Sequence, residues 1–258
     1  EVAMVLLGVT MAMLLAADVP YVWPLDLPRI VTSSFGEYRD GRFHAGLDLR
    51  APIQTPVRAP ADGFVCRVRC SPYGYGRAVY LRLADGRFAV FAHLAGFPPP
   101  LAEYVRARQH DGKSYTVDLE LAPSQFPVHA GDVVAFSGDS GAGAAHLHFE
   151  LRDADERPVS PAGLGLTWPD STRPVIRSVL ISPAGPGTTV NGDIIPLVLP
   201  VRDLGDGRYA CNPVTARGRI GFGVDCLDPA NDGANKLGPY QVRTVAGAPE
   251  SRDGGEAD

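Results

Sequence analysis

The sequence predicts a mainly β protein, in which an antiparallel β-sheet domain is followed by a small β-sandwich-like domain. The 258 residues include 29 glycines and 24 prolines, which divide the chain into short segments. Many of these segments are rich in Val, Leu and Phe, a length and composition typical of strands. Hydrophobic residues make up 45% of the chain, enough to bury a sizeable core, so we expect a globular protein rather than a helical bundle.

The charge distribution argues against nucleic acid as a partner. The formal net charge is -5, and no dense block of Lys or Arg occurs. Nucleic-acid binding depends on such basic clusters, so we do not expect this protein to bind nucleic acid.

Residues 1–17 predict an export signal. An almost unbroken apolar run of about 15 residues extends from Ala3 to Ala17, whereas a helix needs about 20 to cross a bilayer. We therefore expect a signal-peptide core that is removed, with no stable membrane insertion afterwards. The expected location is the periplasm, the cell envelope or the extracellular space. The chain opens on Glu1 rather than Met, without the usual basic stretch, so we expect this signal to be truncated.

Residues 18–169 form the predicted working domain, and they carry all six histidines. The predicted strands are residues 63–69, 78–83, 88–93, 133–137 and 147–151. Asp85-Gly86 lies between the second and third strands and is a strong hairpin signal. Helical spacing over residues 101–109 predicts one short helix beside the sheet.

Residues 170–247 form a second predicted domain, and residues 168–174 form a linker that overlaps its start. Turn residues cut this region into strand-like runs at 175–181, 194–201 and 218–226, a pattern that predicts a small β-sandwich. Residues 248–258 are polar and Gly-rich and form a predicted tail.

Four cysteines fit an oxidising compartment, and they lack the paired CxxC spacing of a structural zinc site. Cys66 and Cys70 would lie about 13 Å apart on one straight strand, too far for a disulfide. Cys211 and Cys226 could pair across neighbouring strands of the second domain. Four buried free thiols are the equally open alternative.

Two local patterns predict a metal site. One is His44-Ala45-Gly46-Leu47-Asp48, and the other is His146-Leu147-His148 in an apolar strand pattern. Alternate side chains of a strand share a face, so one histidine of the second pattern can bind a metal while the other works beside it. His44 and Asp48 can meet at one ion only if the chain folds back between them, and Gly46 supplies the freedom to do so.

Two histidines and one aspartate leave a fourth tetrahedral position for water, an arrangement typical of catalytic rather than structural zinc. Zinc in such a site lowers the pKa of that water and polarises a bound carbonyl, which is the chemistry of amide hydrolysis. A further histidine is then needed as general base.

These residues resemble peptidase family M23, of the lysostaphin and LytM type, whose signature is HxxxD followed by HxH. The resemblance covers residues 24–161 and includes matching segments in the family's order at 33–36, 43–49, 59–63, 91–94, 131–133 and 146–150. It implies one zinc ion held by His44, Asp48 and His148, with His146 as general base. It also implies that His93 orients the water or stabilises the oxyanion, and that the substrate is the peptide part of peptidoglycan.

The sequence departs from the family pattern in several places. Phe91 stands where many members have tyrosine, and residues 137–141 replace a commoner Gly-Asn-Thr-Gly variant. Neither departure changes one of the expected metal ligands, His44, Asp48 and His148. Residues 101–129 resemble a subgroup with an inserted helix and strand, and residues 218–224 and 235–238 resemble the small β-domain attached in that subgroup.

Other polar residues have simpler interpretations. We expect His110 and His129 to be loop residues, and Glu150 to orient a histidine or pair with Arg152. Four arginines could contact substrate carboxylates, although a solvated surface position is the preferred interpretation of each: Arg42, Arg50, Arg58 and Arg77.

Two other functions compete with the peptidase hypothesis. One is a LytM-like binding module that activates another wall hydrolase without cutting, but such degenerate domains lack metal ligands that are present here. The other is a structural wall-binding protein whose second domain is the active part. The bond to be cut stays open among a D-Ala to diamino acid link, a glycine bridge and a non-wall protein.

Overall fold

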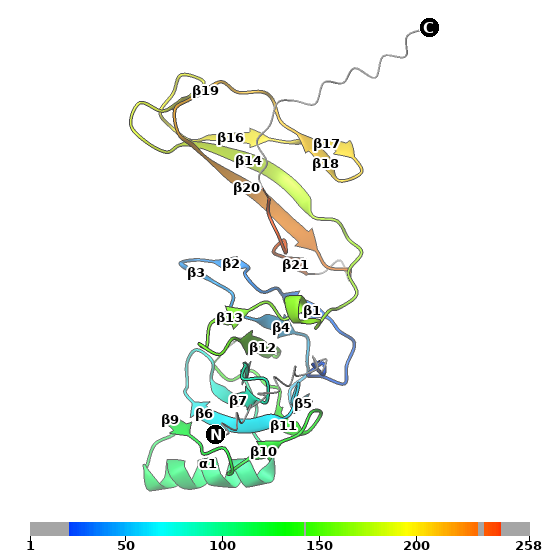
Figure 1. The fold of residues 1–258 in the computed structure, drawn as a ribbon, viewed down its shortest axis with the longest axis vertical. Coiled ribbons are helices and arrows are strands. Elements are labelled where there is room, and N and C mark those ends of the chain that lie inside the picture. The colour runs from blue at the N-terminus through cyan, green and yellow to red at the C-terminus, as the bar shows by residue number, and fades with distance from the viewer. Residues whose placement is uncertain (1–20, 142, 232–234, 244–258) are drawn as a thin grey trace, which may run out of the picture. The chain divides into compact units, whose positions relative to one another are not determined.

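The structure is a computed structural model that describes residues 21–141, 143–231 and 235–243. The chain forms two compact units, and the boundary between them along the sequence lies between Asp170 and Ser171 (Figure 1). The predicted export signal at 1–17 and the predicted tail at 248–258 lie outside the described residues. Within the described ranges, no helix has the length and apolar character needed to cross a membrane.

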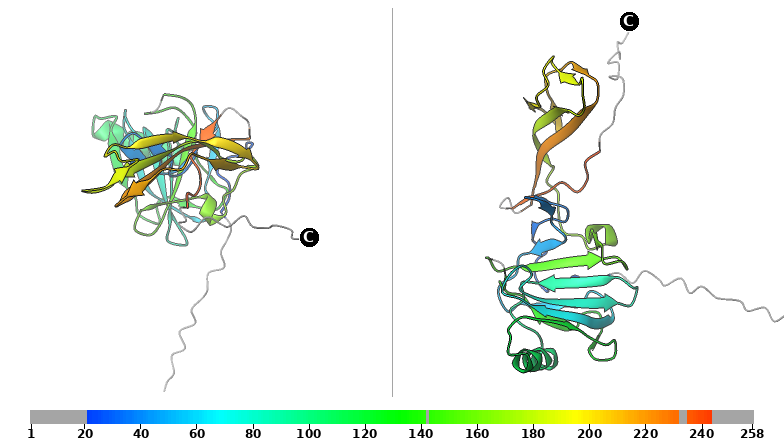
Figure 2. Two further views of the ribbon diagram at one scale, coloured as in Figure 1. Left: turned by 90° about the horizontal axis from the view of Figure 1, so that it is seen from above. Right: turned by 90° about the vertical axis from the view of Figure 1, so that its left-hand side faces the viewer.

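The first unit is built on an antiparallel sheet, as the sequence predicted (Figure 2). This sheet has nine strands. Two short strands join this sheet at its sides, β13 (Pro158–Val159) beside β12 and β9 (Val117–Glu120) beside β6. The main order is β1 (Val31–Ser33), β4 (Leu47–Leu49), β12 (Leu147–Arg152), β8 (Phe88–Ala92), β7 (Arg77–Leu83), β6 (Gly63–Cys70) and β10 (Pro127–Val128).

Smaller elements surround this sheet. The strand predicted at 133–137 is β11 (Val133–Phe136), which pairs with β5 (Pro56–Arg58) in a separate two-stranded sheet. The predicted helix is confirmed as α1 (Pro99–Asp111), and the predicted hairpin joins β7 to β8. A second hairpin, β2 (Tyr38–Arg39) with β3 (Arg42–Phe43), precedes His44. A short 3-10 helix at Ala162–Leu164 follows β13.

β12 lies inside the sheet and separates an apolar face from a polar one. Leu147, Phe149 and Leu151 are each 0% exposed, and Phe149 stacks on Phe91 of β8 with ring centroids 5.2 Å apart. The alternate residues of β12 point to the other face, as the period of a strand requires. That second face is also buried and carries the histidine and glutamate side chains of the site.

The second unit is built on a four-stranded antiparallel sheet: β16 (Leu197–Pro200), β14 (Val175–Pro183), β20 (Ile220–Pro229) and β21 (Lys236–Leu237). Two ribbons accompany it, β15 (Thr189–Val190) with β19 (Ala216–Arg217), and β17 (Arg202–Gly205) with β18 (Arg208–Ala210). Val190 of β15 packs with Ile181 and Leu199 of the sheet to form a small core. The strand predicted at 194–201 begins only at Leu197, after an exposed stretch that includes Ile194.

All four cysteines are free thiols, so the predicted Cys211–Cys226 pairing is wrong. Of the alternative, four buried free thiols, the free state is confirmed, but only Cys70 is buried. Cys226 lies on β20 opposite Ile176 of β14, whereas Cys211 is exposed and outside any strand. The neighbouring strand therefore does not carry the second cysteine. Cys66 and Cys70 both lie on β6, four residues apart along one strand, as their spacing predicted.

Candidate metal centre

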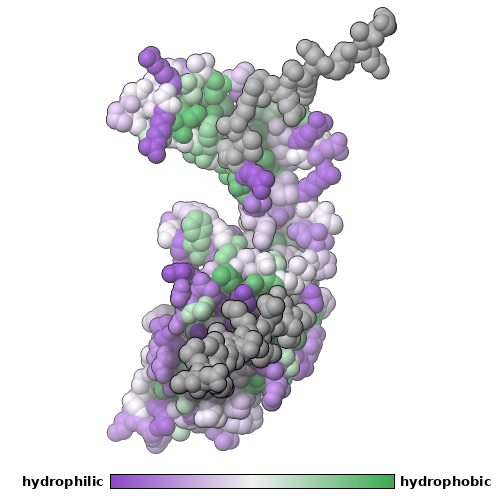
Figure 3. Space-filling model, viewed as in Figure 1, coloured by the Kyte–Doolittle hydropathy of each residue, from purple (hydrophilic) through white to green (hydrophobic). Residues whose placement is uncertain are grey.

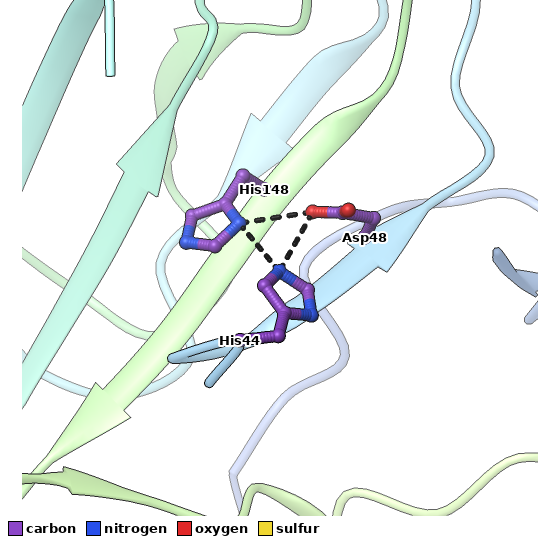
Figure 4. Close-up of side chains that lie close together, drawn as sticks. All are labelled: His44, Asp48 and His148. Atoms are coloured by element: carbon purple, nitrogen blue, oxygen red, sulfur yellow. Dashed lines mark hydrogen bonds and ion pairs between the residues drawn. The ribbon is translucent and has the colours of Figure 1, made fainter. Parts of the chain in front are cut away.

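The three predicted metal ligands meet at the junction of β4 and β12 (Figure 4). Asp48 lies in β4 directly opposite His148 of β12, so the antiparallel register alone brings these two side chains together. His44 follows the β2–β3 hairpin and enters from the segment just before β4. All three side chains are buried.

Three atoms of these residues form a tight triangle. Asp48 Oδ1 lies 3.1 Å from His44 Nε2 and 2.9 Å from His148 Nδ1. The two histidine nitrogens lie 3.1 Å from each other. No other group of three His, Cys, Asp or Glu side chains in the described part of the chain comes together in this way.

In His44 and His148, the outer ring nitrogen is the one that does not face Asp48, and its hydrogen-bond partner identifies the tautomer of the neutral ring. His44 Nδ1 lies 2.8 Å from the carbonyl oxygen of Ser34, and His148 Nε2 lies 2.8 Å from Glu150 Oε1. Carbonyl and carboxylate oxygens accept hydrogen bonds, so both outer nitrogens carry the proton in the neutral rings. The inner nitrogens then aim lone pairs at Asp48.

Lone pairs that converge in this way repel one another unless a cation lies among them. Tetrahedral zinc, with bonds of about 2.1 Å, separates its ligand atoms by roughly 3.4 Å, only slightly more than the distances found here. The donor set therefore fits zinc.

Glu150 supports His148 from the buried face of β12. Its side chain is fully buried and accepts hydrogen bonds from the Tyr75 hydroxyl and from Arg152 Nε, the latter at 2.7 Å. Burial alone would raise the pKa of the Glu150 carboxyl, but the contacts with His148 and Arg152 outweigh it and lower the pKa. The predicted pairing of Glu150 with a histidine and with Arg152 is thus confirmed. Tyr75 was not predicted, because a tyrosine in a Gly-rich loop carries no signal of its own.

Arg39 binds Oδ2, the second carboxylate oxygen of Asp48, and the sequence analysis did not predict this contact. One guanidinium nitrogen donates to Asp48 Oδ2 at 3.0 Å and to Ser33 Oγ at 2.8 Å. Burial raises the pKa of the Asp48 carboxyl, but its contacts with the His148 and His44 rings outweigh burial and hold the pKa well below its usual range. The carboxyl is therefore ionised and presents one oxygen to the two histidines.

His146 and His93 lie together beside the triangle, with ring centroids 4.7 Å apart. His146 Nε2 lies 3.6 Å from Asp48 Oδ1. The Nδ1 atoms of both rings contact carbonyl oxygens, His146 at Ala144 (2.8 Å) and His93 at Ser140 (3.0 Å). Each neutral ring therefore carries its proton on Nδ1 and offers Nε2 as an acceptor.

His93 is held in an unusual backbone conformation. Its φ is 60°, a left-handed value that costs energy for a residue with a Cβ and is typical of functional sites. Burial lowers its pKa to about 4, and repulsion from His146 acts in the same direction. His93 is therefore neutral near pH 7.

Gly46 is needed for a different reason from the one expected. Its φ is not among the positive values, so the fold-back from His44 to Asp48 does not use the left-handed freedom of glycine. A Cβ at this position would lie 2.2 Å from the Phe149 carbonyl oxygen and 2.8 Å from Glu150 Cγ. Close approach of β12 therefore requires the glycine.

The remaining predicted residues lie outside this centre. His110 lies in α1, so its predicted loop position is wrong. His129 is an exposed loop residue, as predicted, and lies 3.5 Å from Asp132. Of the four arginines, Arg58 is paired with Asp26 and Arg77 donates to the Ala95 carbonyl oxygen.

The chain is similar in sequence to several known proteins. The model of "Peptidase family M23" matches residues 42–115. The DD-carboxypeptidase/endopeptidase Mpg of Neisseria meningitidis is 34% identical over 133 residues, 51% of this chain and 25% of that protein. The cell division protein DipM of Caulobacter vibrioides is 29% identical over 147 residues, 55% of this chain and 20% of that protein. The chain thus matches about a quarter or less of the length of these curated relatives.

One solved structure is a catalytic-domain mutant of the prophage-encoded M23 protein EnpA from Enterococcus faecalis. It is 27% identical, has a TM-score of 0.40, and covers 55% of this chain and 94% of its own.

Proposed function

We propose that the first unit is a domain of peptidase family M23 and that the protein is a zinc-dependent endopeptidase that hydrolyses peptide bonds in peptidoglycan. His44, Asp48 and His148 are the proposed zinc ligands. The observation that supports this best is the triangle of three lone-pair atoms, 2.9 to 3.1 Å apart, with two further histidines beside it.

Zinc held there would polarise the scissile carbonyl and activate a water molecule. His146 is the proposed general base, because its Nε2, the acceptor nitrogen of the neutral ring, lies 3.6 Å from Asp48 Oδ1. In this role Nε2 takes a proton from the attacking water and returns it to the leaving amine. The Ala144 carbonyl holds the ring in the tautomer that this role needs.

His93 is the proposed orienting group for the same water. The family resemblance left two roles for it, water orientation and oxyanion stabilisation. The neutral ring has its only proton on Nδ1, committed to the Ser140 carbonyl oxygen, so Nε2 can accept a hydrogen bond but not donate one. This favours water orientation.

Two further observations support the choice of substrate and location. The name of the Neisseria relative describes a peptidase acting on a bond between D residues, which are characteristic of peptidoglycan peptides. The apolar run from Ala3 to Ala17 has the length of an export signal, in keeping with action in the periplasm or cell envelope.

The test is incubation of the purified protein with whole peptidoglycan, followed by mass spectrometry of released peptides with and without a chelator. Metal content is measured on the same samples. His148→Ala is the inactive variant, and His110→Ala, which changes a histidine of α1, is its matched control. Cleavage that the chelator and His148→Ala abolish, but His110→Ala does not, supports the peptidase and identifies the bond from product masses.

The competing activator function makes the opposite prediction. A protein that binds zinc through these residues but releases no peptide, while it stimulates a separate wall hydrolase, would contradict the peptidase proposal.

A further inference from the structure

The Ser140 hydroxyl completes the backbone ladder where β7 begins and β8 ends. It accepts a hydrogen bond from the Arg77 amide at 2.9 Å and donates one to the Leu94 carbonyl oxygen at 2.8 Å. The Leu94 amide donates directly to the Arg77 carbonyl oxygen at 3.1 Å. Two residues of a hydrogen-bonded antiparallel pair normally exchange two direct bonds, so the hydroxyl takes the place of the second one. A side chain from another segment therefore joins the two strands at this point.

This contact lies directly beside His93, the residue before Leu94. The φ of His93 is 60°, and a residue with a Cβ keeps such a conformation only where its surroundings hold it. The His93 amide donates to the Tyr75 carbonyl oxygen at 2.9 Å, and the Leu94 amide donates to Arg77. Both peptide groups that flank His93 are thus held, and the Ser140 hydroxyl strengthens the second attachment.

Ser140 also holds the ring of His93. Its carbonyl oxygen lies 3.0 Å from His93 Nδ1 and accepts the ring proton. One residue therefore binds the histidine region twice, through its hydroxyl to the backbone and through its carbonyl to the ring. The two hydrogen bonds of the hydroxyl restrict where that carbonyl can lie.

Glycines give Ser140 the room for these contacts. A Cβ on Gly76 would lie 2.1 Å from the Ser140 carbonyl oxygen. A Cβ on Gly141, whose φ is 70°, would lie 2.6 Å from the Gly74 carbonyl oxygen. Two backbone segments thus approach closely without side chains between them. The glycines permit this approach, and the Ser140 hydroxyl adds directional hydrogen bonds that fix it.

We propose that Ser140 is a positioning residue for the peptidase reaction, because its hydroxyl holds the backbone so that its carbonyl keeps the proton of His93 on Nδ1. Nε2 then remains an acceptor that can orient the attacking water. A ring released from the carbonyl can carry its proton on Nε2 instead, and that nitrogen no longer accepts a hydrogen bond from water. This inference rests on the proposed function and adds a residue outside the metal-binding and catalytic set.

The tautomer of His93 is measured directly by NMR of the purified protein with nitrogen-15-labelled histidine and added zinc, near pH 7, where the ring is neutral. Correlations between ring nitrogens and ring protons distinguish Nδ1–H from Nε2–H, and His93→Gln identifies the His93 signals. We expect the Nδ1–H tautomer in the wild type and a mixture of both tautomers in Ser140→Ala. This measurement needs no catalysis.

Kinetics tests the consequence for the reaction. Ser140→Ala should lower kcat by roughly tenfold to a hundredfold, the size of effect that a small displacement of an orienting group produces, with KM and zinc affinity close to wild type. Ser140→Thr keeps a hydroxyl on the same carbon and should retain most of kcat and the Nδ1–H tautomer. Ser140→Cys has a similar size but only a weakly hydrogen-bonding thiol, so it should follow Ser140→Ala, and it replaces that variant if the alanine protein does not fold.

Ser137 provides the matched control, because its hydroxyl also bridges two backbone groups. It donates to the Pro52 carbonyl oxygen at 2.6 Å and accepts from the Thr55 amide at 3.1 Å. These partners lie in the segment before β5. Ser137→Ala should therefore lower the thermal stability about as much as Ser140→Ala does, while kcat and the His93 tautomer stay as in the wild type. Equal losses of kcat in the two alanine variants, or an unchanged tautomer in Ser140→Ala, would overturn the proposal.

Failure of the peptidase itself is a separate outcome. If the wild-type protein releases no peptide from peptidoglycan, the proposed function is at fault, and the NMR measurement alone decides the role of Ser140. Loss of the pure Nδ1–H tautomer in Ser140→Ala but not in Ser137→Ala supports the positioning role. A mixture of tautomers at His93 already in the wild type overturns it.

Discussion

The two units of this protein bury their apolar residues to very different extents. In the first unit, Phe91 and Phe149 are 0% exposed and stack in the middle of the sheet. In the second unit, Val198 and Phe222 are 61% and 59% exposed. Figure 3 shows hydrophobic residues on the visible surface of the second unit.

Strand register explains the exposure of Phe222. It pairs with Ile181 and therefore shares the face that carries the small core, yet the short β15–β19 ribbon covers only part of that face. The first unit instead buries both faces of β12. A metal centre needs side chains held to within tenths of an ångström, and two buried faces provide such support.

The largest expected effect comes from Gly46→Ala. A methyl group would lie 2.2 Å from the Phe149 carbonyl oxygen, so β4 and β12 must separate, and we expect a loss of about 4 kcal/mol or more in stability. The matched change in the second unit is Gly221→Ala, where the nearest atom is 3.9 Å away. That change should be neutral or stabilising by up to about 1 kcal/mol. Chemical denaturation measures both, and equal effects would contradict the comparison.

The next largest loss of stability is expected when a core side chain is truncated to alanine. Phe149→Ala removes a fully buried ring and should cost about 3 to 5 kcal/mol, whereas Leu199→Ala, in the thinner core, should cost about 2 kcal/mol. We expect calorimetry to show two transitions, because each unit has its own core, and each variant should lower only the transition of its own unit. A single transition that both variants shift equally would show that the units unfold together.

Glu150→Gln should weaken zinc binding by about tenfold to a hundredfold, because His148 Nε2 loses the carboxylate that orients it. Competition with a chromophoric chelator measures the affinity. The control is Asp225→Asn in the second unit, an exposed carboxylate paired with Arg177. Exposed pairs contribute only about 0 to 1 kcal/mol, so that variant should bind zinc like wild type. An unchanged affinity in Glu150→Gln would contradict the support assigned to this residue.

The smallest expected effect concerns thiol reactivity and leaves the fold intact. Burial raises the pKa of Cys66 to about 11, so only about one molecule in a thousand carries the thiolate at pH 8. Cys211 is exposed and should be alkylated first by iodoacetamide. Labelling at Cys66 should rise about tenfold per pH unit up to that pKa, provided the protein stays folded. Mass spectrometry locates the label, with Cys211→Ser as control, and rapid labelling of Cys66 at pH 8 would contradict the raised pKa of this half-buried thiol.

Local patterns in the sequence were enough to predict much of the first unit. Alternation and turn residues predicted β6, β7, β8 and β12, and helical spacing predicted α1. The i, i+2 spacing put His146 and His148 on one face, and the family resemblance added His44 and Asp48. These four residues do lie together, and their roles in binding and catalysis stay predictions. Each of these inferences needed only neighbours in the chain or a known motif.

Contacts between distant segments were decided only by the tertiary structure. The Tyr75 hydroxyl reaches Glu150 across 75 residues, Arg39 reaches Asp48 from a hairpin without any motif, and the Ser34 carbonyl selects the tautomer of His44. The need for glycine at position 46 likewise comes from β12, a hundred residues away. A sequence shows periodicity along one strand because the backbone repeats locally. Which side chain meets it from another strand depends on sheet order and register, and these arise only when the whole core packs.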